Sequence, residues 1–211
     1  MTLQMLTGTA LVALGKTDQG LQVLLRAHRA SDDAHPTVRA EISVCLGYAH
    51  YRNKQYTAAQ IHLDDVPEGA DIVYARALEI GGWVAWAGGD RETAITRFRA
   101  ALRCIDGCKR YDRFVEVKAL YGLAYLCGEL PRLQLWPEIA SRATRFDWSA
   151  NGVNMWRFWL AAEASLITEM LGRLDESTQW ASLAESIAPS PIYEIMALCR
   201  LAARFGRYRE R

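Results

Sequence analysis

The sequence carries almost no excess charge. Its 25 Lys and Arg residues against 24 Asp and Glu residues give a formal net charge of +1, so no whole-chain field attracts nucleic acid or an anionic membrane. Proline is scarce, at 6 residues in 211, and alanine and leucine outnumber the β-branched residues, which favours helix over sheet. No apolar run approaches the ~20 residues that cross a bilayer. The composition indicates a soluble, helical, globular protein.

Cysteine is also sparse, with 5 residues that lie among apolar neighbours, an arrangement typical of reduced thiols in the cytoplasm. Cys104 and Cys108 have a spacing that can place two thiolates on one metal, but no other Cys or His lies near them and structural zinc needs four ligands. Four histidines form no ligand pair at helical spacing: His28, His35, His50 and His62. We therefore predict that the chain holds no metal and no cofactor.

Catalytic motifs are absent from the sequence. It contains no phosphate loop, no nucleophile elbow and no dinucleotide glycine pattern after a strand. The pairs Gly81-Gly82 and Gly88-Gly89 are explained by a helix crossing and a turn. We predict no catalytic residues and no enzymatic activity.

The chain does contain an internal repeat. The segments 46–59 and 81–94 each place a Gly on a helix, two aromatic residues three apart, a short turn, and an Ala twelve residues after the Gly. Further copies centre on Gly8, Gly122 and Ser165. The intervals between successive equivalent small residues, which include Gly47 and Gly82, are 39, 35, 40 and 43 residues.

These residues resemble the tetratricopeptide repeat family, whose unit is two antiparallel helices that cross at small residues. The resemblance implies an all-α fold: a right-handed α-solenoid of about five helix pairs plus a terminal helix, in a single domain over residues 1–211. Only one interval is near the family's 34 residues. The longer periods, with the run 75–102, are similar to the divergent repeats of maltose-regulator-like bacterial transcription regulators of the LuxR class.

The helical pattern predicts eleven segments. They are 3–14, 18–31, 36–52, 55–65, 71–88, 91–105, 111–127, 137–146, 153–171, 175–188 and 191–205. Asp90, Asp175 and Ser190 are expected caps, and Pro137 is expected in a first helical turn, after a longer connection at 130–136. The last predicted helix is the first helix of a sixth copy, and the second helix of that copy is missing. This favours a fragment of a longer protein over a lone capping helix.

The end of the chain is basic, with five arginines and one glutamate in residues 200–211. Such a run can contact phosphates, but without a docking motif it is more typical of a solvated helix end or linker. We therefore do not expect direct binding of nucleic acid, and we expect no membrane partner.

In the tetratricopeptide family the first helix of each pair lines a concave groove that holds the ligand. The matching positions predict this set of groove residues: Glu41, Tyr48, Tyr51, Arg52, Arg76, Glu79, Trp83, Trp86, Glu116 and Trp159. Aromatic rings supply contact area with little conformational freedom to lose; the alternative is that they pack mainly against neighbouring helices. The Lys and Asn of the family's carboxylate clamp are replaced by other residues: Met5, Thr9, Val44, Tyr48, Glu79 and Trp83.

This groove suits a protein or peptide segment or a small amphipathic molecule. The leading interpretation is a non-catalytic binding scaffold, and more narrowly the regulatory repeat region of a bacterial transcription regulator. The alternative is a self-standing adaptor or homo-oligomerisation module that pairs through its solenoid ends. A helix-turn-helix encoded beyond Arg211 favours the regulator, and a stop codon favours the adaptor.

Overall fold

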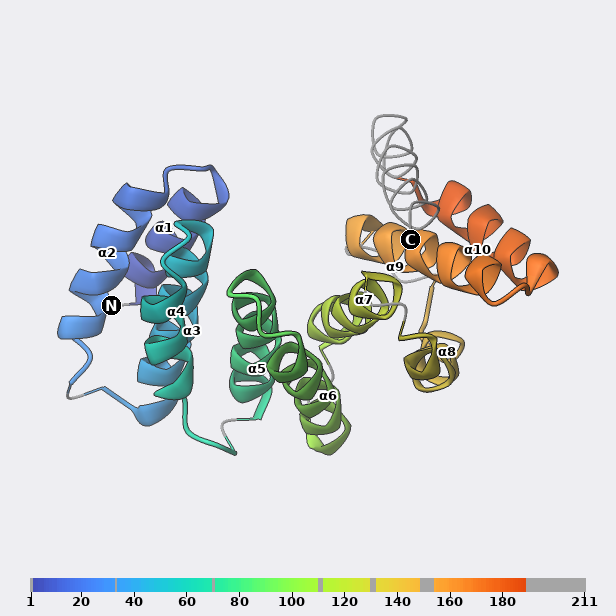
Figure 1. Ribbon diagram of the computed structural model, residues 1–211. Coiled ribbons are helices and arrows are strands. Elements are labelled where there is room, and N and C mark those ends of the chain that lie inside the picture. Colours follow the sequence, from blue (N-terminus) through green and yellow to red (C-terminus); the bar gives the residue numbers. More distant parts are fainter. Residues whose placement is uncertain are drawn as a thin grey trace. The chain divides into compact units, whose positions relative to one another are not determined.

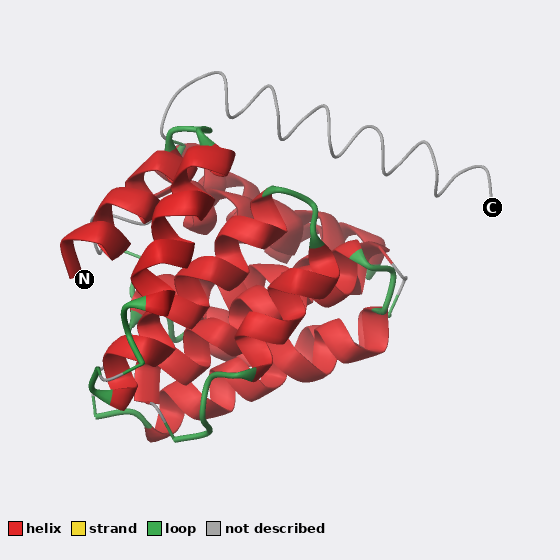
Figure 2. Cartoon of the chain, turned by 90° about the vertical axis from the view of Figure 1, so that its left-hand side faces the viewer, coloured by secondary structure: helices red, strands yellow, loops and turns green. Residues whose placement is uncertain are grey.

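The computed structural model describes residues 2–32, 34–69, 71–109, 112–129, 132–148 and 154–188. Over these ranges the chain is helical and forms no strand (Figure 2). The elements are α1 (Thr2–Ala13), α2 (Thr17–Arg29), α3 (Pro36–Arg52), α4 (Tyr56–Asp64), α5 (Asp71–Ala87), α6 (Arg91–Gly107), α7 (Arg113–Glu129), the short 3-10 helix η1 (Leu133–Leu135), α8 (Trp136–Ala143), α9 (Asn154–Met170) and α10 (Leu174–Ile187). None of these described helices combines the length and the hydropathy that a membrane crossing requires.

The first ten predicted helices are confirmed, with small differences at their ends. The prediction for α3 agrees at both ends, and α8 begins at Trp136 with Pro137 in its first turn but ends at Ala143 rather than at 146. Its preceding connection contains η1. The predicted helix at 191–205 and the cap at Ser190 lie outside the described residues.

One of the two predicted caps within the described residues is confirmed. The Asp90 carboxylate accepts hydrogen bonds from the Thr93 backbone N–H at 3.0 Å and from the Thr93 hydroxyl at 2.7 Å, as an N-cap residue does. The prediction for Asp175 is wrong, because α10 begins earlier and Arg173 occupies the cap position. Gly172, at φ +74°, turns the chain so tightly that Asp175 already lies in the first helical turn.

The chain divides into two compact units, residues 1–116 and 117–211. In the first unit, α1 packs with α2, α3 with α4, and α5 with α6, while α3 also contacts α1, α2 and α5 (Figure 1). In the second unit, α9 packs with α10. Consecutive helices therefore form adjacent pairs, as expected for a helical repeat.

The same close helix crossing recurs in the three pairs of the first unit. A glycine on the first helix faces a large apolar residue sixteen positions later: Gly8 faces Leu24, Gly47 faces Leu63 and Gly82 faces Phe98. A Cβ atom on any of these glycines would lie only 2.5 to 2.6 Å from that side chain. The small residue that defines the repeat is thus required because the two helix axes approach too closely for a side chain.

The turn within each pair uses left-handed backbone. Gly15, Gly89 and Gly172 have φ values of +79°, +91° and +74°, and Lys54 takes the equivalent position at +59°. Each lies seven residues after the small residue of its copy. Glycine adopts this conformation without the steric cost that a Cβ atom brings.

Candidate binding surface

The aromatic residues predicted for the groove lie on α3 and α5. On α3, Arg52 donates a hydrogen bond from Nη1 to the Tyr48 hydroxyl at 2.8 Å, and its guanidinium carbon lies 5.8 Å from the centre of that ring. Both tyrosines of α3 are half-buried, and Arg52 is exposed. The Arg52 guanidinium group and the Tyr48 ring are therefore in contact.

Tyr51 joins the face of α3 to the core and to α5. It packs against the apolar cluster that α3, α4 and α5 share, and its ring lies 6.3 Å from that of Tyr56. Burial raises the pKa of Tyr51 to about 12, with further contributions from Tyr56 and from Glu79 of α5. The phenol is therefore neutral at physiological pH and keeps its O–H donor.

The two tryptophans lie one above the other on α5. Trp83 and Trp86 are half-buried, and their rings meet edge to face at 5.9 Å. Trp83 also meets Phe98 of α6 at 5.2 Å, so part of its surface belongs to the packing of its own helix pair. The alternative that these rings pack against neighbouring helices therefore applies to part of the Trp83 surface.

The charged groove residues differ in how well solvent reaches them. Arg76 is exposed and forms an ion pair of 2.7 Å with Asp112, which also accepts hydrogen bonds from the first backbone N–H groups of α7. Burial is the main cause that raises the pKa of the Cys45 thiol. Glu41 raises this pKa further, and Arg76 lowers it. Glu79, by contrast, is only 2% exposed.

The last two predicted groove residues are buried. Glu116 lies on α7 at the end of the first unit, and Trp159 lies on α9 in the second unit with its ring 5.2 Å from that of Phe158. The accessible part of the predicted groove in the first unit therefore consists of half-buried rings flanked by exposed arginines.

The structure brings together three histidines that the sequence left separate. His50 stacks on His62 at 5.2 Å, and His28 meets His62 edge to face at 5.6 Å. His50 Nδ1 is also 2.7 Å from Gln55 Oε1. The three rings come from α2, α3 and α4, so no spacing along a single helix could reveal them.

The described side chains provide no metal centre. Within them, no group of three or more His, Cys, Asp and Glu residues is placed to hold a metal ion. Burial, with the neighbouring Cys108, raises the pKa of Cys104 to about 11, and Cys104 donates a hydrogen bond to the Asp71 carbonyl at 3.5 Å. The thiol is therefore protonated at neutral pH.

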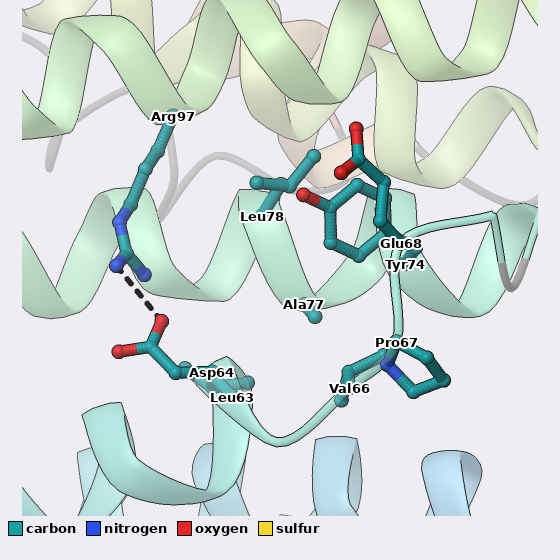
Figure 3. Close-up of a pocket in the computed structure, with 9 residues that line it drawn as sticks. All are labelled: Leu63, Asp64, Val66, Pro67, Glu68, Tyr74, Ala77, Leu78 and Arg97. Atoms are coloured by element: carbon teal, nitrogen blue, oxygen red, sulfur yellow. Dashed lines mark hydrogen bonds and ion pairs between the residues drawn. The ribbon is translucent and has the colours of Figure 1, made fainter.

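A cavity of about 350 Å³ lies between α4, the connection after it, α5 and α6 (Figure 3). Its lining consists of Leu63, Asp64, Val66, Pro67, Glu68, Tyr74, Ala77, Leu78 and Arg97. This cavity could not be predicted from the sequence, because its residues come from separate elements and share no motif.

Compared with models of protein families, with curated proteins and with solved structures, the chain matches none. The likeness to tetratricopeptide repeats therefore depends on the residues described above.

Proposed function

We propose that the chain is a non-catalytic scaffold that binds a peptide segment of a partner protein across the first helices α3 and α5. The observation that supports this most directly is the half-buried state of the rings on these two helices. Each ring is held by neighbours but keeps a surface that a ligand can cover. Anchors of this kind dominate the energetics of protein interfaces.

The polar groups beside the rings favour a peptide as the ligand. Arg52 is exposed and already oriented by the Tyr48 hydroxyl, so it can bind a carboxylate of the peptide with little loss of freedom. Tyr51 keeps a neutral O–H near the buried Glu79. Backbone carbonyls of a peptide are acceptors for such donors, while its apolar side chains contact the rings.

The narrower proposal is that this scaffold is the regulatory repeat region of a bacterial transcription regulator. Its support is the resemblance to divergent tetratricopeptide repeats, together with the recurring crossing of Gly8, Gly47 and Gly82. The coding sequence beyond Arg211 tests this proposal: a helix-turn-helix domain agrees with it, and a stop codon contradicts it.

Selection from a displayed library of random peptides tests the scaffold itself. We expect the wild-type chain to enrich peptides, and we expect Tyr51→Ala and Trp86→Ala each to weaken binding of a selected peptide by on the order of 2 kcal/mol. Trp86 is preferred to Trp83 because Trp83 also packs on Phe98, so that its removal mixes lost packing with lost binding. Titration calorimetry measures the effect.

Tyr56→Ala is the matched control. Tyr56 packs on the same apolar cluster as Tyr51 and contacts it, but it lies on the second helix of the pair. Tyr56→Ala should lower the thermal stability and keep peptide binding. A wild-type chain that enriches no peptide, or equal losses of binding in Tyr51→Ala and Tyr56→Ala, would contradict the proposal.

One observation favours the alternative function, homo-oligomerisation. Leu3, Leu6 and Leu14 on α1 and the turn that follows it are 76%, 59% and 73% exposed. Leu3 and Leu6 are three residues apart and share one face of α1, and Leu14 follows directly at the end of the helix. An uncovered apolar face on the first helix of a unit is a surface that a second copy of the chain can cover.

A further inference from the structure

Gly81 has a structural role that the repeat does not explain. Two adjacent glycines inside α5 are unfavourable for helix formation, and the helix crossing at Phe98 accounts only for Gly82. A Cβ atom on Gly81 would collide with the guanidinium group of Arg97. The missing side chain of Gly81 therefore makes room for the Arg97 side chain to lie against α5.

Arg97 is held at one side of the cavity. Its Nη2 donates to Asp64 Oδ1 at 3.0 Å, and Gln60 donates to the same oxygen at 2.6 Å. The Arg97 side chain is only 20% exposed. A guanidinium group carries five N–H donors, of which this contact uses one, so Arg97 can bind a second anionic group without releasing Asp64.

The opposite side of the cavity carries the other charge. Glu68 and Tyr74 lie together there, with Leu78 between them and the Arg97–Asp64 pair (Figure 3). The pKa of Tyr74 is raised by burial first and by the neighbouring Glu68 carboxylate second. Leu63, Val66 and Ala77 supply apolar surface between the ends.

We infer that this cavity binds a small zwitterion whose carboxylate and ammonium groups are separated by an apolar segment, as in an ω-amino acid. The carboxylate pairs with Arg97, the ammonium group with Glu68 and the Tyr74 hydroxyl, and the methylene chain lies along Leu78. A volume of about 350 Å³ is within the range of small-ligand sites. This site is separate from the peptide-binding face of α3 and α5, so either proposal can fail alone.

Neither a simple anion nor a simple cation fits both ends. An anion would pair with Arg97 but would leave Glu68, at the other end, without a counter-charge. A cation would pair with Glu68 but would leave the remaining donors of Arg97 unused. A ligand that carries both charges can pair with both ends of the cavity, whereas a ligand with a single charge pairs with only one.

Titration calorimetry of the full chain tests the inference with β-alanine, γ-aminobutyrate and ε-aminocaproate. Hexylamine and hexanoate are the probes with a single charge. We expect at least one ω-amino acid to bind about tenfold or more tightly than both of them, because each charged hydrogen bond contributes roughly this factor. No binding of any ω-amino acid, or equally tight binding of hexylamine, would overturn the inference.

Two variants locate the bound molecule. Glu68→Gln, in the exposed connection between α4 and α5, should weaken binding of the best ω-amino acid about tenfold. Gly81→Ala should weaken it because the new Cβ displaces Arg97. Glu185→Gln, an exposed carboxylate of α10, should leave it unchanged. Because Gly81→Ala can also disturb the packing of α6 on α5, Glu68→Gln is decisive: full binding by this variant, with an unchanged thermal melt, refutes the site.

Discussion

Gly82 is the residue at which the repeat pattern of the sequence and the packing agree most closely. It lies where α5 crosses α6, and the ring of Phe98 occupies the space that a side chain would need. Gly107, at the end of α6, has ordinary backbone angles and nothing within 4 Å of an added Cβ atom. The two glycines therefore differ in the space around them rather than in their chemistry.

We predict that Gly82→Ala destabilises the chain by about 1–3 kcal/mol, because Phe98 or the helix axes must move to accept the methyl group. Gly107→Ala should leave stability unchanged or raise it by up to about 1 kcal/mol, since alanine is the better helix former. Urea denaturation followed by circular dichroism measures both. Equal effects of the two substitutions would show that the crossing is not tightly packed.

Tyr51 and Glu79 show the limit of reasoning from single residues. The spacing of the sequence predicted both for one face, and the structure places them close enough that Glu79 raises the pKa of Tyr51. The spacing did not predict that Glu79 is almost fully buried while Arg52 is exposed. Exposure depends on the helices that pack on either side, which no single-helix pattern contains.

The packing of α2, α3 and α4 creates a cluster of imidazoles. His62 lies between His28 and His50, and its pKa is lowered, mainly by burial and then by these two neighbours, while Asp65 at the end of α4 acts in the opposite direction. The His62 imidazole is therefore harder to protonate in the folded chain than in the unfolded chain. Protonation of His62 would place a positive charge between two further titratable rings.

We therefore predict that stability falls as pH falls below about 6.5, the ordinary pKa of His62. The unfolded chain binds its proton there, whereas the folded chain resists protonation until a lower pH, so the free energy of unfolding decreases. His62→Gln should reduce this dependence, and urea denaturation at a series of pH values measures it. His35→Gln, which alters the exposed fourth histidine, should retain it. A wild-type pH dependence in His62→Gln would disprove the role of the cluster.

For the molecule as a whole, the uncovered face of α1 is the feature that bears on assembly. The leucines on it remain largely exposed in the folded chain, whereas Val12 on the same helix is fully buried against α2 and α3. One face of α1 is therefore buried within the unit, and another face is exposed and can contact a second copy of the chain.

We predict weak, concentration-dependent self-association through this face. Leu3→Lys combined with Leu14→Lys should shift the chain to a monomer without loss of stability, because both side chains are exposed and their replacement removes little packing. Analytical ultracentrifugation measures the change, and Leu174→Lys, at another largely exposed position, on α10, is the control. A wild-type chain that is monomeric at all concentrations contradicts the homo-oligomerisation alternative.

The helices and their close crossings could be predicted because their signals are local. Periodic apolar residues, the cap at Asp90, the turn glycines and Pro137 act over one or two helical turns. Gly47 and Gly82 were recognised as crossing residues because the pattern around each is repeated along the chain. Even the error at Asp175 is local, since the cap position of α10, Arg173, directly follows the left-handed Gly172, as Asp90 directly follows Gly89.

The histidine cluster and the cavity could not be predicted in this way. His28, His50 and His62 lie on three helices, and the Arg97–Asp64 pair joins residues 33 positions apart. Their distances depend on how the helices stack, and stacking follows from the summed packing of many apolar side chains rather than from the residues that meet. Side chains that meet only through such packing leave no periodic trace in the sequence.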